Sequence, residues 1–304
     1  MRAVFEQSWR MMSEAEQSVL RRLSVFRGGF RREAAQEVAG GSLLILTGLV
    51  DKSLLRLTAS GRYQIHELLR QFAAEKLAEL PLEHEAALDA HCRYYGDFLA
   101  RHEHQLEIEE APASLVELLP EADNIRAGWE RAISSDWPLA IPVLRRYVMA
   151  MGRFYSACGW YQEGMTSFDK AIHRLETAVA EATDIQPRIV YGSLLLQQAM
   201  LYQYLSRFTE AEALCIRSLE ALQDTGAGLV QARTLRRLGI MNYINEKYDL
   251  AQAYMVESLA LLDPTQHPLS YAKTQLFLGV VAHEFKQYQQ AHQLLEESIS
   301  VLKL

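Results

Sequence analysis

The sequence contains little of what several protein classes require. Its three cysteines, Cys92, Cys158 and Cys215, are odd in number and widely spaced, so they do not suggest a disulfide framework. No apolar run approaches the ~20 residues of a membrane-spanning helix. The first residues also lack the charged head and apolar stretch of a secretory signal. These absences predict a cytoplasmic protein without a membrane span.

Sequence motifs of common catalytic sites are also missing. There is no G-x-x-x-x-G-K-[ST] phosphate-binding loop and no G-x-S-x-G nucleophile elbow. Histidines and one cysteine crowd between residues 84 and 104, but their spacing matches neither H-E-x-x-H nor paired C-x-x-C; they are His84, His91, Cys92, His102 and His104. We therefore interpret this segment as solvated helix surface, and we predict no enzyme, no metal site and no cofactor within this chain.

Positive charge is scarce as well, and it is unevenly distributed. The net charge is −7, yet residues 1–80 hold 12 Lys and Arg against 9 Asp and Glu, whereas the remainder holds 19 against 29. Phosphate-driven nucleic-acid binding normally shows a strong basic patch. Only the front of the chain is compatible with nucleic-acid contact, and its excess charge is small.

The strongest positive signal is internal repetition. Four segments align on the aromatic residues Tyr161, Phe208, Tyr248 and Tyr288, which are spaced 47, 40 and 40 residues apart. A small residue follows each aromatic by three positions, and another precedes it by nine; the two columns are Gly164, Ala211, Ala251, Ala291 and Gly152, Ala199, Gly239, Gly279. Apolar residues around both columns recur at helical spacing. The pattern predicts about four helical hairpins over residues 139–304.

These columns resemble the tetratricopeptide repeat, including Leu238-Gly239 and Leu278-Gly279 at its Leu-Gly pair. Stacked hairpins of this kind form a superhelix whose concave wall consists mostly of the first helices. We expect that wall to bind a protein or peptide partner through Leu196, Met200, Tyr204, Arg236, Ile240, Tyr243, Leu276, Val280 and His283. The alternative is that this stripe of nine side chains packs between repeats. Because no polar capping helix follows residue 304, the array is also expected to continue in a longer protein or to pair with another chain.

The front of the chain predicts a winged helix over residues 1–80. Ser13 and Glu16 form a capping box that begins a helix through Leu23, and further helices are expected over 31–39 and 42–52. Two short strands, 54–58 and 63–66, follow around a turn that contains Gly61. Residues 81–138 are expected to form a helical linker. The predicted fold is thus mainly α, a winged helix followed by an α-solenoid.

The stretches SWRMMSEAEQSVLRRLSVFRGGF, LVDKSLL and GRYQIHELLRQFAAEKL resemble the winged-helix segment of bacterial NB-ARC proteins, a subgroup of the STAND signalling ATPases. The later stretch EADNIRAGWERAI (121–133) resembles the helix that leads into repeats in the same proteins. The resemblance implies a nucleotide-binding module before the winged helix and a sensor after it. It also implies that ATP or ADP is bound by that module rather than by this chain.

Ile65-His66-Glu67 resembles the Met-His-Asp element of that family, with departures at its first and third positions. The resemblance implies that His66 senses the phosphates of the bound nucleotide. The alternative is that His66 ends a strand and caps the next helix.

Three functions remain open from the sequence. The first is the regulatory and sensor portion of a STAND-type ATPase, which relays a signal from the repeats through the winged helix. The second is a stand-alone protein-interaction scaffold. The third, a DNA-binding transcription regulator, would use the arginines of residues 21–32. The sequence of the third helix, SLLILTGLVDKS, disfavours DNA binding because it offers few polar side chains to base edges.

Overall fold

The computed structural model describes residues 2–107, 111–135, 140–181 and 184–302. The chain divides into two compact units, Met1–Gln105 with Glu110–Tyr147, and Leu106–Glu109 with Val148–Leu304. The segment 81–138, expected from the sequence to be a linker, mostly packs within the first unit, where α6 (Pro81–Arg101) contacts the helices before it. Among the described helices, none is long and apolar enough to cross a membrane.

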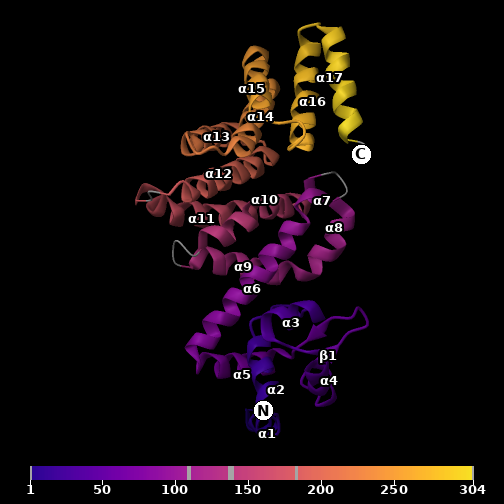
Figure 1. Ribbon diagram of the computed structural model, residues 1–304, viewed down its shortest axis with the longest axis vertical. Coiled ribbons are helices and arrows are strands. Elements are labelled where there is room, and N and C mark those ends of the chain that lie inside the picture. Colours follow the sequence, from indigo (N-terminus) through magenta and orange to yellow (C-terminus); the bar gives the residue numbers. More distant parts are fainter. Residues whose placement is uncertain (1, 108–110, 136–139, 182–183, 303–304) are drawn as a thin grey trace. The chain divides into compact units, whose positions relative to one another are not determined.

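After a first helix that the sequence did not predict, the front of the first unit has the predicted order of three helices and a β-hairpin (Figure 1). The elements are α1 (Arg2–Arg10), α2 (Glu14–Leu23), α3 (Arg32–Ala39), α4 (Leu43–Asp51), β1 (Arg56–Leu57), β2 (Tyr63–Gln64) and α5 (Glu67–Ala78). The strands are antiparallel, with Leu57 opposite Tyr63, and they are shorter than predicted. The capping box is present, because Ser13 Oγ accepts from the Glu16 N–H at 3.3 Å and the Ser13 N–H donates to Glu16 Oε2 at 2.8 Å.

The loop between α2 and α3 is joined to the hairpin by main-chain hydrogen bonds. The Phe30 N–H donates to the Tyr63 carbonyl at 3.0 Å, and the Tyr63 N–H donates to the Phe30 carbonyl at 2.8 Å. Gly29 precedes this bridge with φ +94°, and a Cβ there would lie 2.7 Å from the Tyr63 carbonyl oxygen. Only glycine fits such a close approach at positive φ. Gly29 therefore fixes the loop against the hairpin.

The second half of the first unit is helical. It consists of α6, α8 (Ala111–Leu118), the 3₁₀ turn η1 (Leu119–Glu121), α9 (Ala122–Ser134) and the start of α10 (Ala140–Ala157). α6 packs along α9, and the Tyr147 side chain is completely buried beside Trp129, with ring centroids 5.8 Å apart. The Tyr147 hydroxyl donates to the Cys92 carbonyl at 2.9 Å.

Gly128 makes room for this tyrosine, so we predict that Gly128→Ala destabilises the first unit. The added methyl would overlap the Tyr147 hydroxyl. Overpacking typically costs about 1–3 kcal/mol, against a gain of about 0.5–1 kcal/mol from replacing a helical glycine. Thermal unfolding followed by circular dichroism should show a lower midpoint. Gly48→Ala in α4 is the matched control, because a methyl there meets only the tip of the Glu16 side chain, and it should not lower the midpoint.

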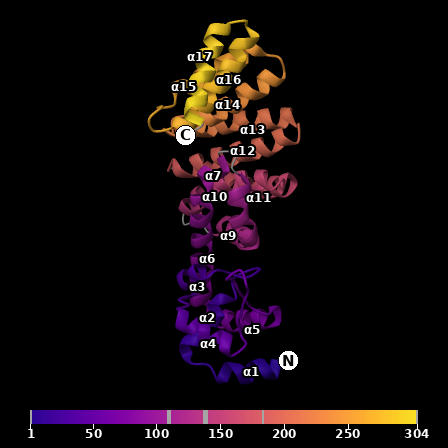
Figure 2. The same ribbon diagram turned by 90° about the vertical axis from the view of Figure 1, so that its right-hand side faces the viewer.

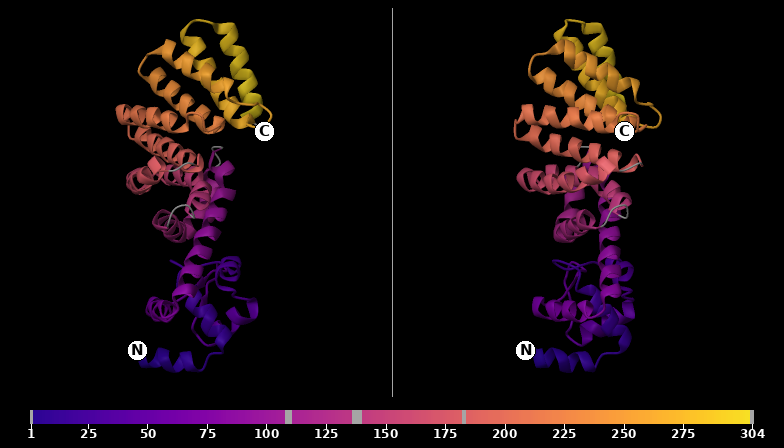
Figure 3. Two further views of the ribbon diagram at one scale, coloured as in Figure 1. Left: turned by 60° about the vertical axis from the view of Figure 1, so that its left-hand side comes forward. Right: turned by 90° about the vertical axis from the view of Figure 1, so that its left-hand side faces the viewer.

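The second unit is an array of helical hairpins, which confirms the predicted α-solenoid. Its helices are α7 (Glu103–Glu107), at the unit boundary, and the end of α10, then α11 (Tyr161–Glu181), α12 (Gln186–Tyr204), α13 (Phe208–Leu222), α14 (Gly228–Ile244), α15 (Tyr248–Ala260), α16 (Pro268–Glu284) and α17 (Tyr288–Leu302). Each pair α12–α13, α14–α15 and α16–α17 forms a hairpin, and neighbouring hairpins stack (Figures 2 and 3). The first helices α12, α14 and α16 contact one another in order and form one wall.

The repeated small residues lie where the two helices of a hairpin approach. A Cβ at Gly239 would lie 2.7 Å from Met255 Cε and 3.2 Å from the Ala251 carbonyl, and one at Gly279 would lie 3.0 Å from Leu295 Cγ. The turn of each hairpin repeats as well, with one residue at positive φ two positions before the aromatic anchor; these residues are Gly159, Ser206, Glu246 and Lys286. The sequence periodicity is therefore a packing periodicity.

The column of serines ten residues after the aromatic anchors also has a packing role. Ser218 Oγ donates to the Gly192 carbonyl at 2.7 Å, and Ser258 Oγ donates to the Ala232 carbonyl at 2.8 Å. Each serine also lies within 3.4 Å of a threonine of the following hairpin, Thr234 or Thr274. Because these hydroxyls are buried and bonded across helices, they stabilise the stacking of successive repeats.

Candidate functional site

His66 lies at the junction of β2 and α5 and caps the helix. Its Nδ1 accepts a hydrogen bond from the Leu68 N–H at 3.3 Å, and its side chain is exposed. The capping role that the sequence left open is therefore present. Glu67 forms an ion pair with Arg70 at 2.7 Å, and hydrogen bonds from Arg70 lower the pKa of Glu67 to about 2. Glu67 is thus an anion at any physiological pH.

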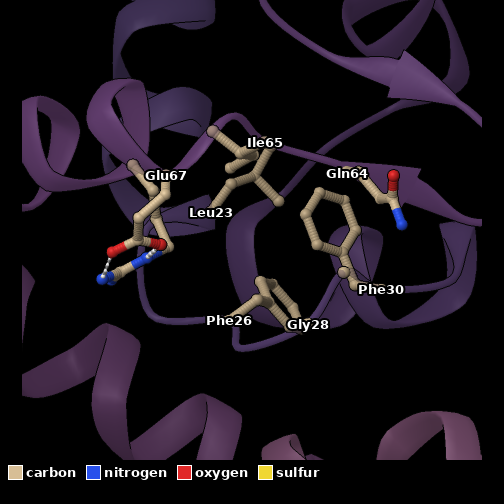
Figure 4. Close-up of a pocket in the computed structure, with 9 residues that line it drawn as sticks. Leu23, Phe26, Gly28, Phe30, Gln64, Ile65 and Glu67 are labelled. Atoms are coloured by element: carbon tan, nitrogen blue, oxygen red, sulfur yellow. Dashed lines mark hydrogen bonds and ion pairs between the residues drawn. The ribbon is translucent and has the colours of Figure 1, made fainter.

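A cavity of about 230 Å³ lies beside this junction (Figure 4). It is bounded by the end of α2, the loop between α2 and α3, and the residues on both sides of His66; the lining residues are Leu23, Phe26, Gly28, Gly29, Phe30, Gln64, Ile65, Glu67 and Arg70. Its wall combines apolar side chains with one arginine and one carboxylate, and those two groups neutralise each other. The cavity therefore offers no unbalanced charge to a ligand.

Behind the loop, Asn124 at the start of α9 forms a buried polar network. Its Oδ1 accepts from the Arg27 main-chain N–H at 2.7 Å and lies 3.3 Å from His91 Nε2, while its Nδ2 donates to the Gly29 carbonyl at 2.8 Å and to Glu121 Oε2 at 3.1 Å. One side chain thus binds the main chain on both sides of Gly28. This network holds the α2–α3 loop against α6 and α9 within the first unit.

Glu121 extends the network to the hairpin. Its carboxylate pairs with Arg62, and it accepts from the Tyr95 hydroxyl at 2.9 Å. Arg62 also donates to the Pro120 carbonyl at 3.0 Å. Burial, followed by the charge of Glu121, raises the pKa of Tyr95 far above its ordinary value. The stretch EADNIRAGW, which the sequence identified only by resemblance, therefore supplies the two residues that connect the loop, the hairpin and α6.

The residues predicted to face the repeat wall differ in accessibility. Leu196 and Met200 are buried, with exposed fractions of 3% and 8%, so their assignment to a partner-binding surface is corrected: they pack within the array. Tyr204 and His283 are exposed, and the remaining five are half-buried; these are Arg236, Ile240, Tyr243, Leu276 and Val280. Tyr204 stacks on Tyr161 with centroids 5.3 Å apart. The accessible part of the stripe thus lies mainly on α14 and α16.

The same wall carries a cationic cluster that the sequence did not reveal. Arg153 Nη2 and Arg233 Nη2 lie 2.9 and 3.2 Å from Glu107 Oε2, and Lys273 Nζ lies 4.0 Å from Glu107 Oε1. The Glu107 side chain is only 6% exposed. Burial alone would raise the pKa of Glu107, but the surrounding cations hold it below its ordinary value.

Arg236 belongs to the same cluster, where its Nη1 donates to the Ser270 carbonyl at 3.0 Å. Burial, together with the neighbouring arginines, lowers the pKa of Arg236 to about 9, and burial lowers that of Lys273 to about 8. The cluster thus joins cationic side chains of α10, α14 and α16 within the second unit.

A sequence signal for this cluster exists in the repeat alignment. Arg233 and Lys273 occupy the same column of the first helices. Arg153 stands in a column that holds Met200, Ile240 and Val280 in the other repeats. Arg236 stands in a column that holds Leu196 and Leu276. A charged residue in an otherwise apolar column indicates that an oppositely charged group lies nearby. The identification of Glu107 as their anionic partner, however, required the three-dimensional structure.

The histidines and the cysteine considered for metal binding make separate contacts, and the interpretation of their segment as solvated helix surface is wrong for His91, Cys92 and His102, which are buried. His91 meets Asn124, and His102 Nδ1 lies 2.9 Å from the Phe98 carbonyl. Within the described part of the chain, no group of three or more His, Cys, Asp or Glu side chains is arranged to hold a metal ion. Burial raises the pKa of Cys92 and of Cys215 to about 12, so both thiols are protonated near neutral pH.

Comparison with known proteins identifies the array. The tetratricopeptide repeat model matches residues 191–263 and 231–303. These segments are tetratricopeptide repeats. Over 262 residues the chain is 29% identical to "Putative HTH-type transcriptional regulator Rv0890c" of Mycobacterium tuberculosis and to its Mycobacterium bovis counterpart Mb0914c. The match covers 77% of this chain, and the chain spans about a quarter (27%) of those relatives.

Two solved structures are similar in parts. One is a Signal Transduction ATPase with Numerous Domains (STAND) protein with a tetratricopeptide repeat sensor, PH0952 from Pyrococcus horikoshii, at 16% identity and a TM-score of 0.44, covering 98% of this chain and 52% of that one. The other is BtubC (BKLC) from P. vanneervenii, at 18% identity and a TM-score of 0.45, covering 76% of this chain and 85% of that one.

Proposed function

We propose that the chain is the regulatory and sensor portion of a STAND-type signalling ATPase of the cytoplasm. The repeat wall binds a protein or small-molecule signal, and the front unit relays it. The front unit is the part of the first unit formed by residues 1–80, which we interpret as a winged helix. The observation that carries this proposal is the accessible row Ile240, Tyr243, Leu276 and Val280 on adjacent first helices of tetratricopeptide repeats. Apolar and aromatic side chains in a row on a solenoid wall are typical of a partner-binding surface.

The front unit supports the relay role through its sequence resemblance and the placement of His66. The capping hydrogen bond uses Nδ1 as an acceptor, which leaves the proton on Nε2. An exposed Nε2–H at the end of a strand is suited to donate to a phosphate held by another module. ATP or ADP would be bound by that module, because this chain contains no phosphate-binding loop.

The test uses the complete gene product. The coding region upstream of Met1 is read first, and we expect a continuous frame that encodes G-x-x-x-x-G-K-[ST]. In the purified product, His66→Ala should accelerate release of bound ADP, whereas His84→Ala, on α6, should not. A true start with nothing before it, or equal ADP release from both variants, would contradict the proposal and leave a stand-alone scaffold.

Signal capture gives a second prediction. Tyr243 is half-buried and donates to Glu284 at 3.2 Å, and Tyr204 is 53% exposed. Replacing both with serine should weaken binding of the cognate signal at least tenfold, because aromatic side chains dominate such surfaces. Isothermal calorimetry with the identified signal measures this change. Unchanged affinity would remove the tyrosines from the binding surface.

DNA binding is the second candidate, since the mycobacterial relatives are named as HTH-type transcriptional regulators. The contacts of the front unit oppose it: Lys52 pairs with Glu16 at 2.5 Å, and Arg21 and Arg22 pair with Glu83 at 3.1 and 2.9 Å. The exposed start of α4 presents Leu43 and Leu44 instead of base-reading side chains. Salt-sensitive DNA binding that is lost in an Arg31→Ala, Arg32→Ala double variant would favour the regulator.

A further inference from the structure

An aromatic cluster lies where the first helices α14 and α16 end. Tyr243 is in the last turn of α14, Tyr248 begins α15, and Phe285 directly follows α16. The ring of Tyr248 contacts both of the others, with centroids 5.7 Å from that of Tyr243 and 6.4 Å from that of Phe285. All three side chains are half-buried and belong to the second unit. The cluster therefore presents aromatic surface to the solvent beside the proposed signal-binding row.

Two carboxylates border these rings. The Tyr243 hydroxyl donates to Glu284 Oε1 at 3.2 Å, and Glu246 lies in the turn that precedes Tyr248. Both glutamates are exposed, and within the described part of the chain neither forms an ion pair. Burial, followed by the charges of Glu284 and Glu246, raises the pKa of Tyr248. The charges that act on this tyrosine are therefore negative.

The second unit contains an equivalent tyrosine–glutamate pair that an arginine completes. The Tyr191 hydroxyl donates to Glu176 Oε1 at 3.1 Å, as the Tyr243 hydroxyl does to Glu284. Arg217 donates to the same Glu176 oxygen at 2.8 Å and to the Tyr191 hydroxyl at 2.6 Å, and its guanidinium carbon lies 6.0 Å from the Tyr191 ring centroid. A guanidinium binds a carboxylate and a ring together because it is planar, charged and rich in donors. Among the described residues, no arginine completes the Tyr243–Glu284 pair.

We propose that this aromatic cluster and its two glutamates form an arginine-binding site on the repeat array; the residues are Tyr243, Tyr248, Phe285, Glu246 and Glu284. The partner is a protein segment with an exposed arginine, whose guanidinium donates to Glu284 and rests on the aromatic rings. Ring faces attract cations, and charge-assisted hydrogen bonds to a carboxylate are stronger than neutral ones. The inference rests on the proposed role of the wall in signal binding and specifies the chemistry of the partner.

The experiment titrates the full chain with N-acetylarginine amide and follows the isotopically labelled tyrosine rings by nuclear magnetic resonance. Saturable shifts are expected at Tyr243 and Tyr248. N-acetylcitrulline amide has a similar shape but no charge, so it should bind about tenfold more weakly. N-acetyllysine amide and tetramethylammonium, which lack a planar fork of donors, should also bind more weakly than the arginine compound.

Protein variants locate the binding. Glu284→Gln should weaken the binding of N-acetylarginine amide about tenfold, because it removes the charged acceptor. Glu257→Gln, which removes an exposed carboxylate of α15 outside the cluster, should leave the affinity unchanged. Phe285→Leu should weaken binding because it removes an aromatic face. Thermal unfolding of each variant confirms folding, and Glu284 is exposed, so its replacement tests the site without disturbing the core.

The inference would be overturned by a lack of saturable shifts, by equal affinity for the arginine and citrulline compounds, or by equal affinity of the Glu284→Gln and Glu257→Gln proteins. Binding of N-acetyllysine amide or tetramethylammonium as tight as that of N-acetylarginine amide would overturn the assignment to arginine. These probes do not require the cognate signal, so their failure leaves the broader role of the wall in place. That role fails separately, if the Tyr204 and Tyr243 double variant keeps full affinity for the cognate signal.

Discussion

Replacing Asn124 with alanine is expected to destabilise the first unit by about 3–5 kcal/mol, because each buried polar group left without a partner costs about 1–3 kcal/mol. The substitution would leave the Arg27 N–H and the Gly29 carbonyl without their side-chain partner and would remove one donor from Glu121. The Asn124 side chain is completely buried, so water does not replace these bonds without a rearrangement. Chemical denaturation followed by tryptophan fluorescence is a suitable measurement, since Trp129 is fully buried one turn further along α9.

The matched control is the neighbouring Asp123→Ala. Asp123 is exposed and forms an i,i+3 pair with Arg126 at 3.1 Å at the start of the same helix. Loss of such a surface pair with its helix-dipole contribution costs about 0.5–1 kcal/mol. If Asn124→Ala proved no more destabilising than Asp123→Ala, the network would not fix the loop.

The loop that Asn124 holds forms one wall of the cavity beside His66. Weakening the network should therefore change the conformation of Gly28 and Gly29 before it changes the array of repeats. Hydrogen exchange resolved by peptide would report this order: faster exchange over residues 26–30 in Asn124→Ala, with unchanged exchange over α14 and α16. Equal acceleration in both units would contradict a local role for the network.

The repeats could be predicted from the sequence because their determinants are local and periodic. Gly239 and Gly279 recur at one spacing since two helices approach there in every hairpin. The Ser13 capping box was predictable for the same reason, because its two residues lie within one helical turn. Periodicity and capping depend on neighbours in the sequence, so one sequence suffices to recognise them.

The polar sites were not predictable because their partners are distant in the sequence. Glu107 and Lys273 are 166 residues apart, and Asn124 and Arg27 are 97 apart. Glu107 sits among other acidic residues and resembles an exposed surface glutamate until its contacts with Arg153, Arg233 and Lys273 are known. The errors at Leu196 and Met200 have a related origin: helical spacing assigns them to the wall, but the depth of burial depends on how the hairpins stack.

Acidification should destabilise the first unit through His91. Burial lowers the pKa of His91 to about 4, with a smaller contribution from the charge of Arg27, although the hydrogen bond to Asn124 opposes the change. The ring packs between Phe26 and Tyr95, with centroids 5.2 and 4.7 Å away. The folded state therefore keeps this imidazole neutral well below the pH at which it is protonated in the unfolded chain.

The direction of the change in stability follows from the number of protons that the folded and unfolded states bind. In the unfolded chain His91 titrates near its ordinary pKa of about 6.5, so between about pH 6.5 and 4 the unfolded state binds more protons than the folded state. The stability contributed by neutral His91 is complete above pH 6.5 and is lost as the pH falls through this window. Between pH 7 and pH 5 the expected loss is about 2 kcal/mol.

Denaturant unfolding at pH 7 and pH 5, followed by tryptophan fluorescence, measures this loss, and His91→Gln isolates it. Glutamine retains a donor for Asn124 but does not titrate, so the variant should be less stable than the wild type at pH 7 and should lose about 2 kcal/mol less on acidification. His84→Gln, seven residues earlier on α6 and 39% exposed, should keep the wild-type pH dependence. If His91→Gln loses as much stability as the wild type between pH 7 and pH 5, the acid sensitivity arises elsewhere and His91 is not the titrating group.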